Sequence, residues 1–313
     1  MAVTHRARHT ITVDAPARTV YGIIADAADW PRVFPPSVHV EQTPLGDGEE
    51  TLRIWATAND EVKSWQSRRR LDPQALTVGF RQEKTTAPAT SMGGEWQIRP
   101  LSDDRCEVVL LHDFTAEGDT PENVEWINRA LDHNSEAELD RMKATAESAG
   151  QLGELLCTFE DQVRIEAPSA DVHAFLWRGE EWQDRLPHVA RVKLTEPDTD
   201  IQVLEMDTIA RDGSRHTTES VRVSLGSARI VYKQLRVPPL LTAHVGAWLL
   251  DESEGVTTAV ARHTVVINPA SLSLLGPDTT VADARSFIRD ALGTNSLATL
   301  RHAKEFTERS PAR

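Results

Sequence analysis

Apolar and polar residues alternate with a period of two along six segments in the first half of the chain, and this period predicts β-strands. The segments cover residues 38–44, 49–57, 61–71, 75–83, 90–99 and 105–114. Turn signals such as GDG and LDP separate them,. An opening strand, apolar at Ile11 and Val13, precedes them. The first half therefore predicts one opening strand followed by about six antiparallel strands.

Helical periodicity is confined to the beginning and the end of this half. A short stretch after Pro16 predicts a first helix, and a long helix is predicted over about 121–148,. Thr120 can cap the long helix, and Pro121 takes its first position. Its apolar residues recur at helical spacing, at Val124, Ile127, Leu131, Leu139 and Met142,. A sheet that curls around this helix would leave an interior suited to medium-sized, largely apolar ligands.

The same order of elements occurs twice. Residues 12–35 align with 164–187 at an offset of 152, which matches Trp30 with Trp182. Residues 134–147 resemble 295–308 at an offset of 161. The chain is therefore predicted to be an α+β protein of two homologous domains, 1–150 and 151–313.

Composition narrows the class of protein. The chain has 313 residues and a net charge of -14, which disfavours nonspecific binding to nucleic acid or anionic membranes,. No apolar run approaches the ~18 residues that span a bilayer, and the N-terminus lacks the apolar core of a secretory signal. Two cysteines, Cys106 and Cys157, without metal-ligand spacing favour a reducing compartment and argue against a zinc site,. These features predict a cytoplasmic protein without membrane or nucleic-acid partners.

One predicted strand carries an arginine on its inward face. In DEVKSWQSRRRL, residues 60–71, strand alternation places Trp65, Ser67 and Arg69 on one face, and Arg68 and Arg70 on the water face,. Burial of an unpaired charge is costly. Arg69 should therefore have either an acidic partner, such as Glu95 or Asp113, or a functional anion.

These motifs resemble a known family. The order APxxxVY…DxxxWPxxFP, then WxSxR, then M…W, then a terminal helix resembles the polyketide cyclase branch of the START/Bet v 1-like (SRPBCC) superfamily. Two fused copies resemble the di-domain aromatase/cyclases of bacterial type II polyketide synthases, which make aromatic polyketide antibiotics. The resemblance implies two tandem helix-grip domains, each a curved antiparallel sheet wrapped around a long C-terminal helix with an interior pocket.

The resemblance also implies a reaction. The family folds and dehydrates a poly-β-ketone carried on an acyl carrier protein, in company with the ketosynthase and ketoreductase of the same synthase. For di-domain members it implies a chain reduced at carbon C9, first-ring aldol closure between carbons C7 and C12, and dehydration to an aromatic ring. No metal or redox cofactor is implied.

Candidate site residues follow from the motif and the resemblance. Arg69 would stabilise the enolate oxygen that forms when a β-ketone loses its α-proton, and Ser67 would hold a water or a ketone oxygen. A buried ion pair for Arg69 and a bond to backbone for Ser67 are the structural alternatives. The proposed substrate-binding residues, several of which could equally be core or helix surface, are Trp30, Trp65, Arg81, Met92, Trp96 and Asn134. His112 and Asp113 are adjacent on a strand, so at most one reaches the interior.

The second half predicts a supporting domain. At the 152 offset, Thr217, Glu219 and Val221 replace the motif of the first half. His244 and His263 could point inward, but the sequence shows no constellation around them. The first domain is therefore predicted to be catalytic. The alternative functions are a START-like protein that binds a lipid or polyphenol without reaction, or a structural scaffold in a synthase complex.

Overall fold

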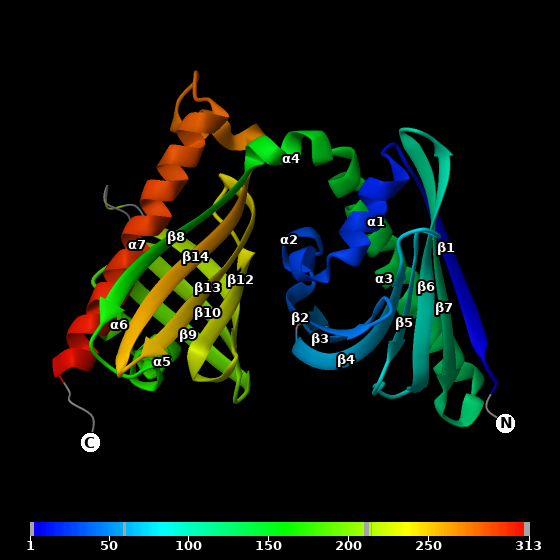
Figure 1. Cartoon of the computed structure of the whole chain (residues 1–313), viewed down its shortest axis with the longest axis horizontal. Helices are drawn as coiled ribbons and strands as arrows, with labels where there is room; N and C mark the ends of the chain where they lie inside the picture. Colours follow the sequence, from blue (N-terminus) through cyan, green and yellow to red (C-terminus); the bar gives the residue numbers. More distant parts are fainter. Residues whose placement is uncertain (1–2, 59–60, 210–212, 214, 310–313) are drawn as a thin grey trace. The chain divides into compact units, whose positions relative to one another are not determined.

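The computed structural model describes residues 3–58, 61–209, 213 and 215–309, and the chain divides into two compact units, 1–150 and 151–313 (Figure 1). Each unit contains a seven-stranded antiparallel sheet, short helices and one long C-terminal helix. This architecture confirms the predicted tandem helix-grip fold. No helix within the described ranges has the length and apolar character needed to cross a membrane.

The first unit has its strands in the order β1-β7-β6-β5-β4-β3-β2. Its elements are β1 (His5–Val13), α1 (Ala17–Ala25), α2 (Trp30–Val33), β2 (Ser37–Gly46), β3 (Glu49–Ala58), β4 (Glu61–Asp72), β5 (Thr77–Gln82), β6 (Ala89–Ser102), β7 (Arg105–Ala116) and α3 (Pro121–Glu147), with single 3₁₀ turns at Ala27–Asp29 and Glu117–Asp119.

The second unit repeats this order as β8-β14-β13-β12-β11-β10-β9. Its elements are β8 (Leu156–Ile165), α5 (Ser169–Trp177), α6 (Trp182–Arg185), β9 (Val189–Asp198), β10 (Ile201–Ile209), β11 (Arg215–Ser224), β12 (Arg229–Arg236), β13 (Leu241–Ser253), β14 (Val256–Ile267) and α7 (Val281–Arg309), with 3₁₀ turns at Gly179–Glu181, Gly226–Ala228 and Pro269–Leu275; α4 (Ala149–Leu155) joins the two units.

The long helix of the first unit forms for the reasons that its sequence indicates. The Thr120 side chain accepts a hydrogen bond from the backbone N–H of Asn123 at 3.3 Å and caps the first turn,. Leu139 and Met142 are buried in one cluster with Trp96 and Leu110 of the sheet. The helix α3 therefore packs its apolar stripe against the inner face of the sheet, mainly along β1 and β7,.

Residues opposite each other on adjacent strands point to the same side of the sheet. Among the rows that they form on the inner face, one in each sheet contains a buried arginine. In the first unit the row is Glu50, Arg69, Phe80, Gly94 and His112. In the second unit it is Gln202, Arg222, Tyr232, Gly246 and His263. We call these the first and second inner rows.

The second inner row corrects the alignment of the two halves. Opposite Leu52 on β3 stands Ser67, and opposite Leu204, its counterpart on β10, stands Ser220. Strand β11 is therefore shifted by one residue from the 152 offset. The counterparts of Trp65, Ser67 and Arg69 are Thr218, Ser220 and Arg222, so the prediction that the second half loses the serine and the arginine is wrong.

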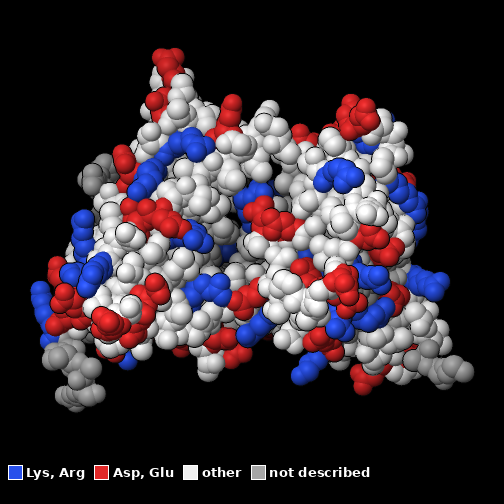
Figure 2. Space-filling view, viewed as in Figure 1, with Lys and Arg blue, Asp and Glu red and all other residues white. Residues whose placement is uncertain are grey.

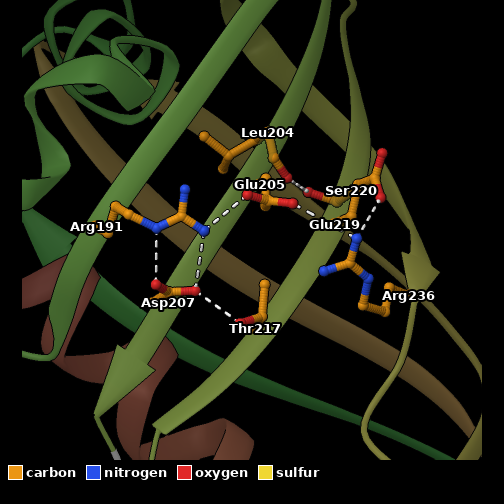
Figure 3. A network of polar contacts seen from close by, with 8 residues as sticks. All are labelled: Arg191, Leu204, Glu205, Asp207, Thr217, Glu219, Ser220 and Arg236. Carbon is orange, nitrogen blue, oxygen red and sulfur yellow. Dashed lines mark hydrogen bonds and ion pairs between the residues drawn. The ribbon is translucent and has the colours of Figure 1, made fainter.

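Two of the three residues matched at the fixed offset, Thr217 and Glu219, lie on the outer face of the second sheet instead (Figure 3). Thr217 donates to Asp207 at 2.8 Å, and Asp207 binds Arg191 at 2.8 Å. Glu219 pairs with Arg236 at 3.2 Å. These side chains form a partly exposed ion-pair network across β9 to β12, and such surface pairs contribute little stability individually.

The glycine in each inner row, fourth of its five residues, is required by the aromatic ring and the backbone beside it. A Cβ on Gly94 would collide with the backbone oxygen of Leu111 and come within 2.7 Å of Cζ of Phe80. A Cβ on Gly246 would likewise collide with the hydroxyl of Tyr232. The absent side chain therefore lets the ring of β5 or β12 lie flat over the neighbouring strand.

We expect Gly94→Ala to lower the free energy of unfolding of the first domain by about 2 kcal/mol, because overpacking at this site forces the strand backbone to shift. Gly22→Ala is the control. A Cβ at Gly22, inside α1, meets nothing within 4 Å, and the change should be neutral or stabilise by up to about 1 kcal/mol. Urea unfolding of the full chain measures both, and equal stability of the two variants would contradict the packing argument.

Candidate functional site

Arg69 on β4 is 2% exposed and makes four hydrogen bonds within the first domain. Its Nε donates to Glu50 at 2.8 Å, and its Nη2 bonds the same carboxylate. Nη1 donates to the carbonyl oxygen of Ile24, and Nη2 to that of Ala25, each at 2.8 Å. These carbonyls end α1, where a helix leaves unpaired acceptors and partial negative charge. The arginine therefore closes the end of this helix and pairs with a carboxylate at the same time.

The acidic partner of Arg69 differs from the expected ones. Glu95 bonds a side chain on its own strand, and Asp113 pairs with Arg81 at 2.7 Å. Glu50 takes the place because it stands directly opposite Arg69 on β3. Burial lowers the pKa of Arg69, and the Glu50 carboxylate acts in the opposite direction. Nη1 carries a second hydrogen, for which the described part of the chain provides no partner,.

The two other members of the WxSxR motif lie beside Arg69. Ser67 is 5% exposed, and its hydroxyl donates to the carbonyl oxygen of Arg81 at 3.1 Å. The Ser67 hydroxyl thus makes the bond to backbone that is the structural alternative to a role in the reaction. Trp65 is half-buried and packs against a cluster that includes Leu52 and Ile54. The motif therefore forms one continuous inward surface.

Arg81 was expected to line the interior, and that position is wrong. Strand alternation places it on the outer face, where it is exposed and its Nη2 donates to Asp113 at 2.7 and 2.9 Å. Gln82, the next residue, is paired with Ser67 and shares the inner face,. An alignment error of one residue along a strand thus moves a predicted side chain from the inner face of the sheet to the outer face.

His112 reaches the inner face and Asp113 does not, which confirms that the adjacent pair forms no dyad. The His112 ring meets Phe80 edge-on at 5.6 Å between ring centroids. Its Nδ1 is buried and has no hydrogen-bond partner in the described ranges. Burial lowers the pKa of His112 to about 4. The imidazole is therefore neutral at pH 7 and can accept or donate a hydrogen bond.

The remaining residues that were predicted to bind substrate lie in different parts of the first domain. Trp30 is half-buried, donates from Nε1 to the carbonyl oxygen of Ile23 at 3.2 Å, and lies 5.0 Å from the Arg69 guanidinium. Trp96 is 7% exposed and belongs to the main core. Met92 is half-buried against the cluster around Phe114. Asn134 is exposed on α3.

Two residues of the first domain escaped the sequence analysis. Glu50 had an unremarkable context, because only the β3–β4 register places it opposite Arg69. Glu138 lies one helical turn after Asn134 on α3 and is exposed, and nearby protein raises the pKa of its carboxyl group above the ordinary value. The helical spacing of 134 and 138 was the available signal. Among the described residues, no group of three or more His, Cys, Asp or Glu could hold a metal ion.

Arg222 repeats the role of Arg69 in the second domain with one change. It is 2% exposed, bonds the carbonyl oxygens of Leu176 and Trp177 at the end of α5, and donates to Oε1 of Gln202 at 2.9 Å. Gln202 stands where the first domain has Glu50. The pKa of Arg222 falls to about 9 because of burial. The second domain thus holds a buried guanidinium on an amide rather than a carboxylate.

Comparisons with known proteins agree with this architecture. The family described as polyketide cyclase / dehydrase and lipid transport matches residues 4–147. The chain is 44% identical to the granaticin polyketide synthase bifunctional cyclase/dehydratase of Streptomyces violaceoruber, covering 98% of this chain and 95% of the relative. It is 47% identical to the actinorhodin polyketide synthase bifunctional cyclase/dehydratase of Streptomyces coelicolor, with 96% of each covered.

Solved structures give the same result in three dimensions. The di-domain ARO/CYC BexL from the BE-7585A biosynthetic pathway superposes with a TM-score of 0.92 at 49% identity, covering 98% of this chain and 100% of that one. The di-domain ARO/CYC StfQ from the steffimycin pathway gives a TM-score of 0.87 at 36% identity, covering 97% and 98%. The chain belongs to the polyketide cyclase/dehydratase family, among its two-domain members.

Proposed function

We propose that this protein closes and aromatises the first ring of a C9-reduced poly-β-ketone held on an acyl carrier protein, by aldol condensation between carbons C7 and C12 followed by loss of water. The observation that carries the proposal is similarity over nearly the whole chain, in both domains, to cyclase/dehydratases of polyketide synthases. Fold likeness alone would not support a reaction.

The first inner row supports this chemistry. In the aldol step one carbon loses a proton, its enolate attacks a ketone carbon, and the ketone oxygen becomes a hydroxyl that leaves later as water. Arg69 is the electrostatic stabiliser of the enolate oxygen through its remaining Nη1 hydrogen, and Ser67 can accept a hydrogen bond from an enol or a water. The neutral His112 is suited to take or return a proton.

Apolar side chains exclude water around these polar groups. Trp30, Trp65 and Met92 are the proposed walls nearest the row, with Trp96 behind them. Asn134 and Glu138 on α3 are the proposed polar contacts from the helix side. Glu138 is exposed, so its proposed part is a polar contact with the substrate, and its raised pKa is not needed for the proposal.

The carrier protein is the proposed macromolecular partner, and the synthase family of the relatives supports it. Arg68 and Arg70 are exposed on the outer face of β4, although Arg68 lies 3.6 Å from Glu49. Acidic and basic side chains are interspersed over the face shown in Figure 2. The proposed docking surface for the carrier protein is therefore the local pair Arg68 and Arg70 rather than an extended basic face.

We expect Arg69→Ala to abolish the dehydrated first-ring product in a reconstitution with a minimal polyketide synthase and a ketoreductase, read by mass spectrometry. A loss of 10²-fold or more is about the effect of removing an electrostatic donor from an active site. Glu50→Gln is the informative companion, because the second domain folds with glutamine at this position. It keeps the guanidinium, so the product should persist.

Arg81→Ala serves as the control, since this arginine lies on the outer face. A folded Arg69→Ala protein with wild-type product would remove Arg69 from the reaction. A wild-type protein that binds polyphenols or lipids but leaves the product profile unchanged would support the carrier function instead.

The pKa of His112 gives a further prediction. It is about 4 in the folded protein against an ordinary 6.5, so the folded state binds fewer protons between these values. The resulting stability is complete above pH 6.5 and is lost as the pH falls toward 4. We expect wild type to lose up to about 3 kcal/mol more than His112→Gln over this range. Urea unfolding at several pH values tests it, and parallel curves for the two proteins would show that His112 is not buried as a neutral group.

A further inference from the structure

Three polar side chains form a cluster on the inner face of the second sheet. Nε2 of His244 lies 3.0 Å from Nδ1 of His263, and the hydroxyl of Tyr232 lies 3.1 Å from that same Nδ1. The residues come from β13, β14 and β12 respectively. The sequence alone predicts that His244 and His263 could point inward, but only the strand register brings the three residues together.

The first domain has a different surface at these positions. Tyr232 corresponds to Phe80 in the inner rows, and His263 corresponds to His112. His244 precedes the row glycine by two residues, as Met92 does in the first domain. One phenol and one imidazole thus replace two apolar groups on the same backbone, whereas Arg222 keeps the place of Arg69.

The cluster is buried and incompletely paired. His244 is 2% exposed and His263 is 4% exposed. Nδ1 of His244 and Nε2 of His263 have no hydrogen-bond partner in the part of the chain that the structure describes. Buried polar atoms in native proteins are almost always satisfied, and an unsatisfied one is costly. An ordered water or a bound molecule that is not part of the chain can satisfy the two free ring nitrogens.

The protonation states of His244 and His263 determine which hydrogen-bonding groups a ligand needs. Desolvation lowers the pKa of His263 to about 4, although Asp161 opposes the shift, and it lowers the pKa of His244 well below its ordinary value. Both rings are neutral at pH 7. When two neutral imidazoles share one N–H···N bond, one of the outer nitrogens carries a hydrogen and the other carries a lone pair, whichever tautomer is present. With that bond formed, the two outer ring nitrogens present one free donor and one free acceptor, and the Tyr232 hydroxyl beside the shared Nδ1 is a further polar group.

We propose that Tyr232, His244 and His263 form a second ligand site, which binds a neutral oxygenated ring or enol able both to donate and to accept a hydrogen bond. Phe159 stacks on His263 at 5.1 Å between ring centroids and supplies an apolar surface beside it. The choice of a phenol or an enolised polyketone as ligand class rests on the proposed function. The second domain then binds a cyclised or enolised compound rather than only supporting the first.

The test is NMR of the full chain labelled with ¹⁵N-histidine at pH 7.5, titrated with 1,3-dihydroxynaphthalene. We expect the His244 and His263 ring resonances, assigned by His244→Met and His263→Gln, to shift saturably. His244→Met introduces the first domain's residue, so the fold should persist, and it should weaken binding at this site by tenfold or more. Tyr232→Phe, which introduces the residue at the Phe80 position, is the second variant and should also weaken it. The matched probe 1,3-dimethoxynaphthalene, which cannot donate, should bind at least tenfold more weakly.

Unmoved His244 and His263 resonances at saturating probe would overturn the site, and so would equal affinity for the two probes. The His112 resonances report separately on the first domain. A failure of the cyclase reconstitution with Arg69 variants would therefore leave this result intact, and the converse also holds.

Discussion

Each domain depends on a buried arginine that bonds the last carbonyl groups of its first helix. Arg69 and Arg222 tie a central strand to α1 and α5, at a point where the chain must turn back over the sheet. A tryptophan ring lies near each guanidinium, Trp30 at 5.0 Å and Trp182 at 4.8 Å. The second domain shows that a carboxylate partner is dispensable, because carbonyl oxygens, an amide and aromatic faces hold the cation there. The inward arginine is thus first a structural requirement, and any chemistry is a second use of it.

This dual role changes how the first site has to be understood. A guanidinium paired with Glu50 exerts a weaker field on a substrate oxygen than a free one, since opposite charges a few ångströms apart largely cancel at a distance. Most of its hydrogens are also occupied. Stabilisation of an enolate therefore has to come from close contact with the remaining Nη1 hydrogen and from neighbouring neutral groups such as His112. Arg222, held on Gln202, keeps more of its field within the second domain.

Periodicity predicted the strands and the long helices well, because alternation and capping are local properties of the sequence. The Thr120 cap, the seven strands and the tandem helix-grip fold are all confirmed. The predictions that were wrong required the strand alignment to be correct to a single residue. A shift of one residue turns a strand side chain to the other face, which explains both the misplaced Arg81 and the misalignment of Arg222. The partner of Arg69 was missed for a related reason, since Glu50 becomes its neighbour only through β3–β4 pairing.

The two domains also show how little sequence change separates two interiors. Gly94 and Gly246 hold equivalent positions and let an aromatic ring lie across the sheet. In the first domain this ring is that of Phe80, which forms an apolar surface next to His112. In the second domain the ring is that of Tyr232, whose hydroxyl contacts His263. His244, at the position of Met92, contacts the same imidazole. Because backbone and register are the same, loss of catalytic residues is a poor description of the second domain. Its serine and arginine are kept, and a phenol and a second imidazole stand where the first domain has Phe80 and Met92.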